Sequence, residues 1–317
     1  MDLSVVIPVY NEEESVEPLV DEITSVMDRL GKRHEIIIVD DGSRDRTFER
    51  LAALCRRTYT LRVIRLKRNF GQTAALAAGL CHARGEFVVL MDGDGQNDPA
   101  DIPAMLAQLE SGFDLVCGWR FKRRDSFLRR RLPSIIANGL ISWATQVKLH
   151  DYGCTLKAMR REIAKDLKLY GEMHRFIPVI AFERGARIME MKVNHRPRLR
   201  GTSKYGITRI LRVILDLLTV KFLLSYSTRP SHMFGLAGLA SAGLGILIGL
   251  YLSLQKFIYN AEIGGRPLLL LGILLIFIGF QFITMGLLGE MLARTYHESQ
   301  DRPVFAIREI LGERDDA

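Results

Sequence analysis

The residues with the clearest chemical potential are two aspartates separated by one glycine, directly after a short apolar run. The run Glu86 to Met91 has the length of a buried strand, and Asp92-Gly93-Asp94-Gly95-Gln96 follows it. Carboxylates and an amide at alternate positions supply hard oxygen ligands for Mg²⁺ or Mn²⁺. Because ligands bind outside the carboxyl ends of the strands in open α/β sheets, the segment predicts a metal site able to hold nucleotide phosphates.

Two other interpretations of this segment compete with a metal site. Asp-Gly pairs are common in turns, so a turn without chemistry is the first alternative. An EF-hand calcium loop is the second, but it requires Gly at position six and Glu at position twelve. Asn97 and Pro103 stand at those positions, which excludes the EF-hand.

The composition limits the partners and the compartment. The 317 residues carry a formal net charge of +8, which suits nucleic acid, an anionic membrane surface or phosphorylated substrates. The 4 cysteines are scattered without a Cys-x-x-Cys pair, which argues against a zinc site or a disulfide framework and fits a reducing compartment. The first residues lack the basic region of a signal peptide.

Strands alternate with helices through the first part of the chain. The expected strands are 3–9, 35–39, 61–66, 86–91 and 114–117, and the expected helices are 15–30, a segment ending near 57, 73–83 and 101–109. This alternation predicts an α/β fold with a doubly wound, mainly parallel sheet.

Acidic residues follow three of these strands. Glu12, the pair Asp40-Asp41 and the pair Asp92/Asp94 should converge on one rim of the sheet, where they accept hydrogen bonds from a base and ribose or bind metal. No Gly-x-Gly-x-x-Gly follows the first strand, and no Gly-x-x-x-x-Gly-Lys-Ser/Thr is present. Dinucleotide-binding and P-loop folds are therefore not expected.

Three motifs in this order resemble the nucleotide-sugar motifs of glycosyltransferase family 2. They are Pro8-x-Tyr10-Asn11-Glu12, Val39-Asp40-Asp41-Gly42-Ser43 and Asp92-Gly93-Asp94-x-Gln96. Within that family the chain is similar, over nearly its full length, to the polyprenyl-phosphate glycosyltransferases. The subgroup includes dolichol-phosphate mannose synthase and the bacterial undecaprenyl-phosphate glucosyl and aminoarabinosyl transferases. The resemblance implies a GT-A-like catalytic domain.

The resemblance also implies a donor site and a metal site. Donor-binding positions are Pro8, Tyr10, Glu12, Val39, Asp41, Asp92, Gly93, Asp94, His174, Arg198 and Lys204. The metal, Mg²⁺ or Mn²⁺, would be held by Asp92, Asp94 and Gln96. Arg198 and Lys204 lie in a basic loop with Gly and hydroxyl residues and would grip the donor phosphates. His174 would touch the hexose, with an ordinary surface histidine as the alternative.

A dense basic run, Arg120 to Arg131, follows the fifth strand. Most of it is expected to be a solvated face, but a lipid phosphate acceptor requires some of these charges, because Arg pairs with phosphate through two hydrogen bonds. In similar enzymes an Arg, an Arg and a Ser bind the acceptor phosphate, which implies Arg120, Arg130 and Ser134. Arg129 and Arg131 remain alternatives to Arg130.

Asp94 and Asp151 are the expected catalytic carboxylates. An aspartate at the position of Asp151 is often called the base in the family. A phosphate monoester is already largely ionised near neutral pH, since its second pKa is about 6. It needs aiming and charge neutralisation more than deprotonation. Asp151 is therefore expected to orient an arginine or the metal, with a purely structural turn as the alternative.

The remainder of the chain predicts membrane association. Residues 207–229 form an expected amphipathic helix at the membrane interface, with a buried helix of the soluble domain as the alternative. Two uncharged segments, about 233–255 and 267–289, each exceed the roughly 20 residues that span a bilayer. Lysine and arginine are frequent on the outer flanks, so the catalytic domain and the C-terminus are expected in the cytoplasm, at the inner membrane.

Small residues recur at regular spacing in both segments. They are Ala237, Ser241, Gly245 and Gly249 in the first, and Gly272, Gly279 and Gly286 in the second. Such spacing permits close helix packing, either within a protomer or in a homo-oligomer such as a dimer or tetramer. The expected organisation is a catalytic domain 1–206, the amphipathic helix 207–229, a transmembrane hairpin 230–290 and a cytoplasmic tail 291–317.

The expected function is inverting transfer of a hexose from a nucleotide sugar, expected to be UDP-glucose or a related UDP-sugar, to undecaprenyl phosphate. The product would be a β-linked polyprenyl-phosphate sugar for cell-envelope glycan or lipid modification. One alternative is a mannose synthase that uses GDP-mannose, and another is an inactive membrane-tethered nucleotide-sugar sensor or scaffold. A processive polysaccharide synthase is not expected, because the chain has no Gln-x-x-Arg-Trp. Nucleic acid is not an expected partner.

Overall fold

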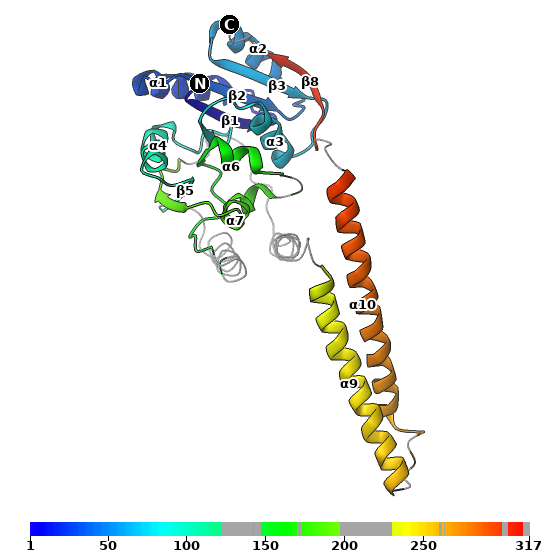
Figure 1. Ribbon diagram of the computed structural model, residues 1–317. Helices are drawn as coiled ribbons and strands as arrows, with labels where there is room; N and C mark the ends of the chain where they lie inside the picture. The colour runs from blue at the N-terminus through cyan, green and yellow to red at the C-terminus, as the bar shows by residue number, and fades with distance from the viewer. Residues whose placement is uncertain are drawn as a thin grey trace. The chain divides into compact units, whose positions relative to one another are not determined.

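The computed structural model describes the chain in several stretches (Figure 1). The described residues are 1–121, 142, 147–169, 171, 173–196, 230–259, 262, 264–299 and 304–312. The chain divides into two compact units, the first formed by Met1–Leu217 with Pro303–Ala317 and the second by Leu218–Arg302. The first unit is built on a β-sheet and the second on two long helices.

A sheet of 8 strands within the described residues forms the centre of the first unit. The strands are β1 (Leu3–Val9), β2 (His34–Asp40), β3 (Leu61–Leu66), β4 (Phe87–Leu90), β5 (Leu115–Trp119), β6 (Lys157–Arg160), β7 (Ile188–Lys192) and β8 (Ile307–Leu311). Their order in space is β7-β5-β6-β4-β1-β2-β3-β8. The pairs β4–β1, β1–β2, β2–β3 and β5–β7 are parallel, whereas β6 and β8 run antiparallel to their neighbours. The sheet is therefore mixed, with a parallel centre.

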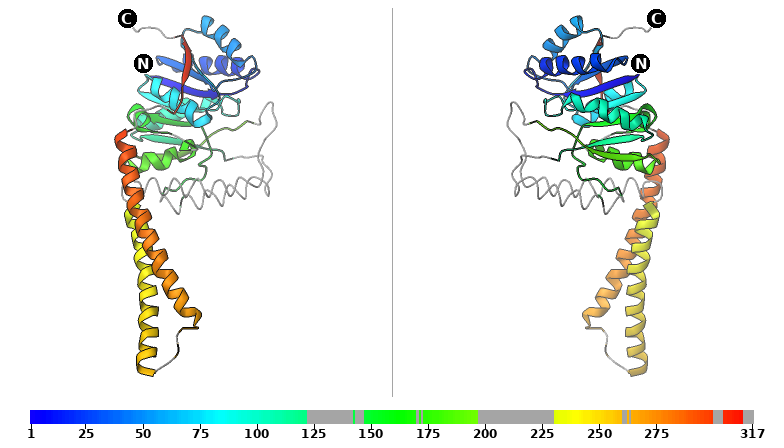
Figure 2. Two further views of the ribbon diagram at one scale, coloured as in Figure 1. Left: turned by 90° about the vertical axis from the view of Figure 1, so that its right-hand side faces the viewer. Right: turned by 90° about the vertical axis from the view of Figure 1, so that its left-hand side faces the viewer.

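Helices cover both faces of this sheet, as the side views show (Figure 2). They are α1 (Val16–Leu30), α2 (Thr47–Arg57), α3 (Gln72–His82), α4 (Ile102–Glu110), α6 (Arg161–Asp166) and α7 (Ile177–Glu183), with short 3₁₀ turns η1 (Pro99–Asp101) and η3 (Met173–Phe176). Helix α1 is amphipathic because its apolar residues recur every three or four positions. Those that it buries are Val16, Leu19, Val20, Ile23, Val26 and Met27.

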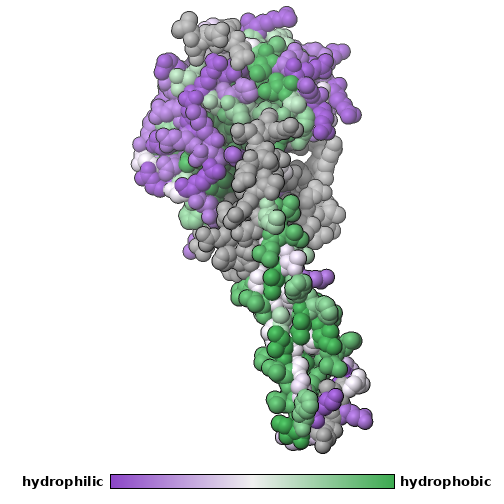
Figure 3. Space-filling model, turned by 45° about the vertical axis from the view of Figure 1, so that its right-hand side comes forward, coloured by the Kyte–Doolittle hydropathy of each residue, from purple (hydrophilic) through white to green (hydrophobic). Residues whose placement is uncertain are grey.

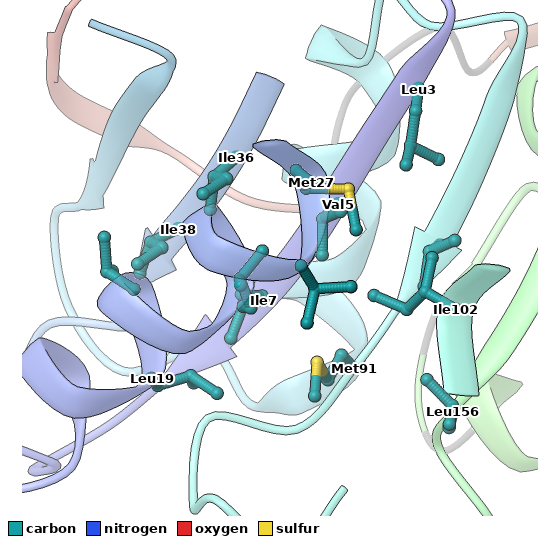
Figure 4. Close-up of a cluster of buried hydrophobic side chains, with 14 of the residues drawn as sticks. Leu3, Val5, Ile7, Leu19, Met27, Ile36, Ile38, Met91, Ile102 and Leu156 are labelled. Atoms are coloured by element: carbon teal, nitrogen blue, oxygen red, sulfur yellow. The ribbon is translucent and has the colours of Figure 1, made fainter. Parts of the chain in front are cut away.

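The main core lies between α1, α2, α4 and one face of the sheet. Leu3, Val5 and Ile7 alternate along β1 and point to the same side, where Leu19 and Met27 of α1 meet them (Figure 4). All seven residues of β1 are buried, so the strand is covered on both faces. This explains why the central strands have continuous apolar sequences rather than alternating ones.

Helix α3 covers the opposite face and approaches the sheet closely. A β-carbon at Gly79 would overlap Val6 Cγ1 and lie 3.2 Å from Val39 Cγ2. The alanine-rich sequence of α3, buried over most of its length, suits this approach because small side chains keep the helix near the strands. The helix thereby fixes β1 and β2, the two strands that lead into the first two predicted motifs.

The five predicted strands and the mainly parallel sheet are confirmed, with ends shifted by at most two residues. Three strands were not predicted. β6 has only four residues and begins with Lys157, and β8 lies in a stretch rich in charged residues. Short strands with charged residues give little periodic signal, and their pairing partners are distant in sequence.

Strand β8 lies in the segment 291–317, for which the sequence analysis expected only a tail. It pairs with β3 at the edge of the sheet, and Arg65 of β3 contacts Glu309 of β8 at 3.2 Å (Figure 1). Gly312, with φ +76°, ends the strand where a side chain would strike Leu61 O. The chain therefore returns to the sheet after passing through the second unit.

The second unit contains α9 (Pro230–Tyr259) and α10 (Pro267–Ser299), which lie side by side (Figures 1 and 2). Phe234–Tyr259 and Pro267–Gly289 are long and apolar enough to cross a membrane, judged by length and composition. The drawn face of this helix pair is mostly hydrophobic (Figure 3). Many large apolar side chains on both helices are exposed, among them Leu236, Leu247, Phe257, Leu270, Phe277 and Phe280.

Glycines let α9 and α10 come into backbone contact. A β-carbon at Gly245 would lie 2.6 Å from Gly272 O, and one at Gly238 would lie 2.6 Å from Gly279 O. Ser241 Oγ donates a hydrogen bond of 2.9 Å to Leu275 O. The predicted small-residue series thus contributes to packing within the chain, although Gly238 rather than its neighbour Ala237 makes the contact.

Candidate active site

The acidic loop after β4 is shaped by its glycines. A β-carbon at Gly93 would lie 2.5 Å from Val9 Cγ1 and 3.0 Å from Pro8 O, so the loop passes directly over the end of β1. Gly95 has φ +72°, a conformation that disfavours residues with a β-carbon. These two positions bring Asp92 and Asp94 to the carboxyl end of the central strands.

Hydrogen bonds close this loop on itself and tie it to a neighbouring segment. Asp92 N donates to the buried Asn97 Oδ1 at 3.2 Å, and Gln96 N donates to Asp94 Oδ1 at 3.1 Å. The side-chain amide of Gln96, a predicted metal ligand, donates to Arg196 O at 3.4 Å. The amide nitrogen of Gln96 therefore serves the loop structure in this conformation.

The environment of Asp92 favours a nearby cation. Burial raises the pKa of Asp92 above its ordinary value, and the negative charge of Asp94 raises it further. The Thr155 hydroxyl and the charges of Arg120 and Lys157 oppose this rise in pKa. Gln72 Nε2 also donates to Asp92 Oδ1 at 2.8 Å.

The donor set of this loop fits Mg²⁺ or Mn²⁺. Among the described residues no cluster of three or more His, Cys, Asp and Glu could enclose a metal ion. Two adjacent carboxylates are nevertheless sufficient for Mg²⁺, which commonly binds one or two carboxylates and completes its shell with water and substrate phosphates. Asp92 and Asp94 thus provide part of the ligand set of a divalent cation, and the oxygens of a bound diphosphate would supply further ligands.

The first two motifs lie on neighbouring strands. Pro8 of β1 and Val39 of β2 are partners in the parallel register. Tyr10, which is 39% exposed, follows them at the rim. The two following loops are joined, because Asn11 N donates to Ser43 Oγ at 3.0 Å and Glu12 N donates to Thr47 Oγ1 at 2.9 Å. The structure therefore brings together Pro8, Tyr10, Glu12 and Val39, as the motifs predict.

Asp41 holds a third loop in place. Its carboxylate accepts hydrogen bonds from Phe70 N at 2.7 Å and from Gly71 N at 2.8 Å. Burial raises the pKa of Asp41, and these two hydrogen bonds partly offset the rise. Asp41 therefore fixes the backbone at Phe70 and Gly71, a contact that the sequence motifs do not reveal.

Arg120 is held by Asp151 through two hydrogen bonds. Arg120 Nε donates to Asp151 Oδ2 at 2.7 Å, and Nη2 donates to Oδ1 at 2.8 Å. Burial would lower the pKa of Arg120, but the hydrogen bonds and charge of Asp151 outweigh it and raise the pKa. Glu190 Oε1 accepts from Asp151 N at 2.9 Å and so positions Asp151 from strand β7. Asp151 therefore fixes the direction of Arg120.

Lys157 is a buried cation close enough for its charge to act on Asp92, and the three motifs do not include it. It begins β6 beside Leu90, the last residue of β4, and it is 2% exposed. Its ammonium donates to Cys154 O, and its charge acts on both Asp92 and His174. The signal was a lysine within an apolar stretch, Leu156 to Met159, where a buried strand would require a reason for a charge.

His174 lies in η3 and contacts Thr73 at the start of α3. Its Nδ1 is 2.7 Å from Thr73 Oγ1. Burial, followed by the charges of Arg175 and Lys157, lowers the pKa of His174 to about 3. The imidazole is therefore neutral, and it borders the site as a hydrogen-bonding group rather than as a cation.

Several predicted site residues lie outside the described residues. They are Arg130, Ser134, Arg198 and Lys204, and the expected amphipathic helix 207–229 also lies outside them.

Comparisons with known proteins agree with the three motifs. A family model described as glycosyl transferase family 2 matches residues 4–168. The chain is 48% identical to the dodecaprenyl-phosphate galacturonate synthase of Rhizobium johnstonii, over 100% of this chain and 95% of that protein. It is 40% identical to the undecaprenyl-phosphate 4-deoxy-4-formamido-L-arabinose transferase of Shewanella sediminis, over 98% of this chain and 92% of that protein.

Solved structures agree with the fold. Glucosyl-3-phosphoglycerate synthase from Mycobacterium tuberculosis, in complex with Mn²⁺ and UDP-glucose, is similar with a TM-score of 0.55 and 23% identity. The match covers 69% of this chain and 78% of that chain. At this identity the likeness shows the GT-A-like fold.

The buried environment of His174 predicts how stability depends on pH. Because its folded pKa lies below the unfolded value of about 6.5, the unfolded state binds the extra proton, and stability falls as pH drops below about 6.5. The loss should reach about 1.4 kcal/mol at pH 5.5. His174→Gln should remove this part of the pH dependence, measured as melting temperature in detergent from pH 7.5 to 5.5. Equal pH slopes for the variant and the wild type would contradict the burial of a neutral His174.

Proposed function

Because the chain belongs to glycosyltransferase family 2, we propose that it transfers a sugar from a nucleotide donor to the phosphate of a polyprenyl lipid. The observation that carries the proposal is that negatively and positively charged side chains lie near each other at the carboxyl end of the central strands. Asp92 and Asp94 form an acidic pair suited to a metal and diphosphate, and the charge of Arg120 acts on Asp92. Both relatives named above carry a polyprenyl phosphate in their names, which supports this acceptor.

The proposed reaction is a single in-line displacement. An oxygen of the lipid phosphate attacks the anomeric carbon, the bond from that carbon to the diphosphate oxygen breaks, and the nucleoside diphosphate leaves with the bonding electrons. The configuration inverts, and the family resemblance implies a β-linked product. The attacking phosphate needs no base, because its second pKa is about 6.

The residues of this chain would orient and neutralise charge on both sides of the anomeric carbon. Asp92 and Asp94 would hold Mg²⁺ or Mn²⁺, with Gln96 as the further predicted ligand. When bound, such a metal neutralises the charge that develops on the leaving diphosphate. Lys157, buried beside Asp92, adds a positive charge to the same side of the site.

Asp151 would act on the acceptor side as a positioning residue. Both of its oxygens bind Arg120, and the side chain is 4% exposed. A carboxylate in that arrangement keeps the guanidinium aimed rather than collecting a proton from the acceptor. Arg120 would then present its remaining N–H groups to the lipid phosphate, together with the predicted Arg130 and Ser134.

The donor is proposed to be a UDP-sugar. UDP-glucose was the expected donor, but the relatives are named for galacturonate and 4-deoxy-4-formamido-L-arabinose. We therefore place the UDP derivatives of these two sugars beside UDP-glucose as candidates, with GDP-mannose as the alternative nucleotide.

A donor panel tests the proposed function. Purified full-length protein with undecaprenyl phosphate should transfer sugar from at least one UDP donor, and EDTA should abolish the transfer until Mg²⁺ or Mn²⁺ is added back. Transfer from GDP-mannose alone would identify a mannose synthase. Donor binding without transfer from any of the four donors would favour the sensor or scaffold and would contradict the proposal.

The two-sided site predicts separate effects on acceptor and donor. Arg120→Ala removes a charge-assisted contact to the lipid phosphate, and such bonds are worth about 1.5–3 kcal/mol. The kcat/KM for lipid phosphate should fall roughly 10- to 100-fold. The Kd for the nucleotide sugar, measured by calorimetry, should barely change. Arg120→Lys should recover only part of the kcat/KM for lipid phosphate, because an ammonium group cannot form the paired hydrogen bonds of a planar guanidinium.

Arg187→Ala is the matched control, because it removes another arginine that binds an aspartate, Asp114, from an exposed position on the same unit. Its kinetics in lipid concentration should equal those of the wild type. If Arg120→Ala loses nucleotide-sugar affinity while its dependence on lipid phosphate is unchanged, Arg120 belongs to the donor side and the assignment is wrong.

We further propose that α9 and α10 cross the inner membrane as a hairpin, with the first unit in the cytoplasm. Strand β7 precedes α9 along the chain and strand β8 follows α10, and both strands belong to one sheet. A sheet cannot straddle a bilayer, and the two helices must therefore cross an even number of times. The frequent Lys and Arg on these flanks favour the cytoplasmic side.

Reporter fusions test this topology. A reporter inserted near Asn260 should be periplasmic, and one fused after Ala317 should be cytoplasmic. Both reporters on the same side of the membrane would refute the hairpin.

A further inference from the structure

Arg196 follows β7 and joins three elements of the first unit. Its Nη1 donates to Glu22 Oε2 at 2.9 Å and its Nη2 to Glu22 Oε1 at 2.7 Å, so it binds this carboxylate of α1 with both arms. Nη2 also lies 2.9 Å from Asp98 Oδ1. Asp98 stands at the end of the acidic loop and caps η1 by accepting from Ala100 N at 3.0 Å.

The backbone around Arg196 is bonded to the same loop. Arg196 N donates to Gln96 O at 2.9 Å, and Gln96 Nε2 donates back to Arg196 O at 3.4 Å. His195 forms an antiparallel bridge with Asn97. Segment 194–196 thus lies along the loop like a short added strand, with the guanidinium of Arg196 anchoring it to α1.

These contacts lead directly to the acidic pair. Gln96 N donates to Asp94 Oδ1, and Asn97 Oδ1 accepts from Asp92 N. The two residues that fix the acidic pair are therefore the same two that segment 194–196 holds. The loop needs such support, because it contains Gly93 and Gly95 and brings two like charges together.

We propose that Arg196 is a positioning residue for the metal-binding loop. By holding Glu22, Asp98 and the backbone of Gln96 in one arrangement, it keeps Asp94 and Asp92 at the spacing that a divalent cation needs. The inference rests on the proposed function, since it assigns a role in metal binding to a residue that does not itself touch the metal or the substrate.

An ordinary surface ion pair would have a different effect. Arg196 is partly exposed, and exposed pairs contribute little to folding stability. Arg57 provides a matched comparison, because it also binds a carboxylate of α1, Glu17, at 2.6 Å. Among the described residues, the ion pairs of Arg57 are with Glu17 and Asp21 of α1 and none is with the acidic loop. If Arg196 had a purely structural role, replacing either arginine would have the same effect on the Mn²⁺ dependence of activity. If Arg196 positions the loop, only its replacement would change that dependence.

The test compares Arg196→Gln, Arg196→Lys and Arg57→Gln in the full-length protein. Mn²⁺ binding in the presence of UDP is followed by electron paramagnetic resonance and should weaken only in the Arg196 variants. The Mn²⁺ dependence of activity is measured at saturating donor and lipid phosphate, together with KM for lipid phosphate. The melting temperature without metal should be the same for Arg196→Gln and Arg57→Gln. Arg196→Gln should raise the Mn²⁺ concentration for half-maximal activity about tenfold, as expected for loss of charge-assisted bonds. The KM for lipid phosphate should stay unchanged. Arg196→Lys should recover part of the loss, and Arg57→Gln should match the wild type.

Equal Mn²⁺ dependence in Arg196→Gln and Arg57→Gln would overturn the inference. If Arg196→Gln does not fold, Glu22→Gln tests the inference in its place. This variant weakens the contact between Arg196 and α1 but keeps the contact with Asp98 and the backbone hydrogen bonds of Arg196. It should raise the required Mn²⁺ about threefold, and no change in the Mn²⁺ requirement would again overturn the inference. If the wild-type enzyme keeps its activity in EDTA, the proposed metal-dependent function is wrong. This result separates a failure of the proposed function from a failure of the role assigned to Arg196.

Discussion

The repulsion between carboxylates gathered at one rim of the sheet is the constraint on which the site depends. A parallel sheet delivers the residues after β1, β2 and β4 to the same edge, and in this chain several of them are acidic. Two such charges in hydrogen-bonding range repel by about 4 kcal/mol near a protein surface. Three of the described aspartates near this edge accept hydrogen bonds from other residues: Asp151 from Arg120, Asp41 from Phe70 N and Gly71 N, and Asp92 from Gln72. Lys157 adds a buried positive charge.

A second constraint joins the catalytic sheet to the apolar helices. β8 completes the edge of the sheet only after the chain has passed through α9 and α10. The edge strand of the sheet therefore comes from a segment that follows both apolar helices along the chain.

The sequence predicted the parts of the fold that depend on local patterns. The apolar runs of β1 to β5 and the amphipathic α1 were predicted because burial on one or both faces leaves a periodic signal. β6, β7 and β8 were missed because their short, partly charged sequences are fixed by partners far along the chain. The third motif predicted Asp92 and Asp94 as site residues, and the family resemblance implied Arg120 and Asp151. They could not reveal that Asp41 binds the loop at Phe70, or that Lys157 is buried beside Asp92, since both depend on contacts between separate strands and loops.

The most direct measurement is Mn²⁺ binding followed by electron paramagnetic resonance, with and without UDP, in the wild type and in Asp94→Asn. Asp92 and Asp94 supply only part of the ligands of the metal, and the diphosphate of the nucleotide supplies others. The wild type should therefore bind one Mn²⁺ per chain tightly only when UDP is present. Asp94→Asn should keep its melting temperature and lose this binding. Tight Mn²⁺ binding that persists in Asp94→Asn with UDP would contradict the assignment of the metal and diphosphate to this loop.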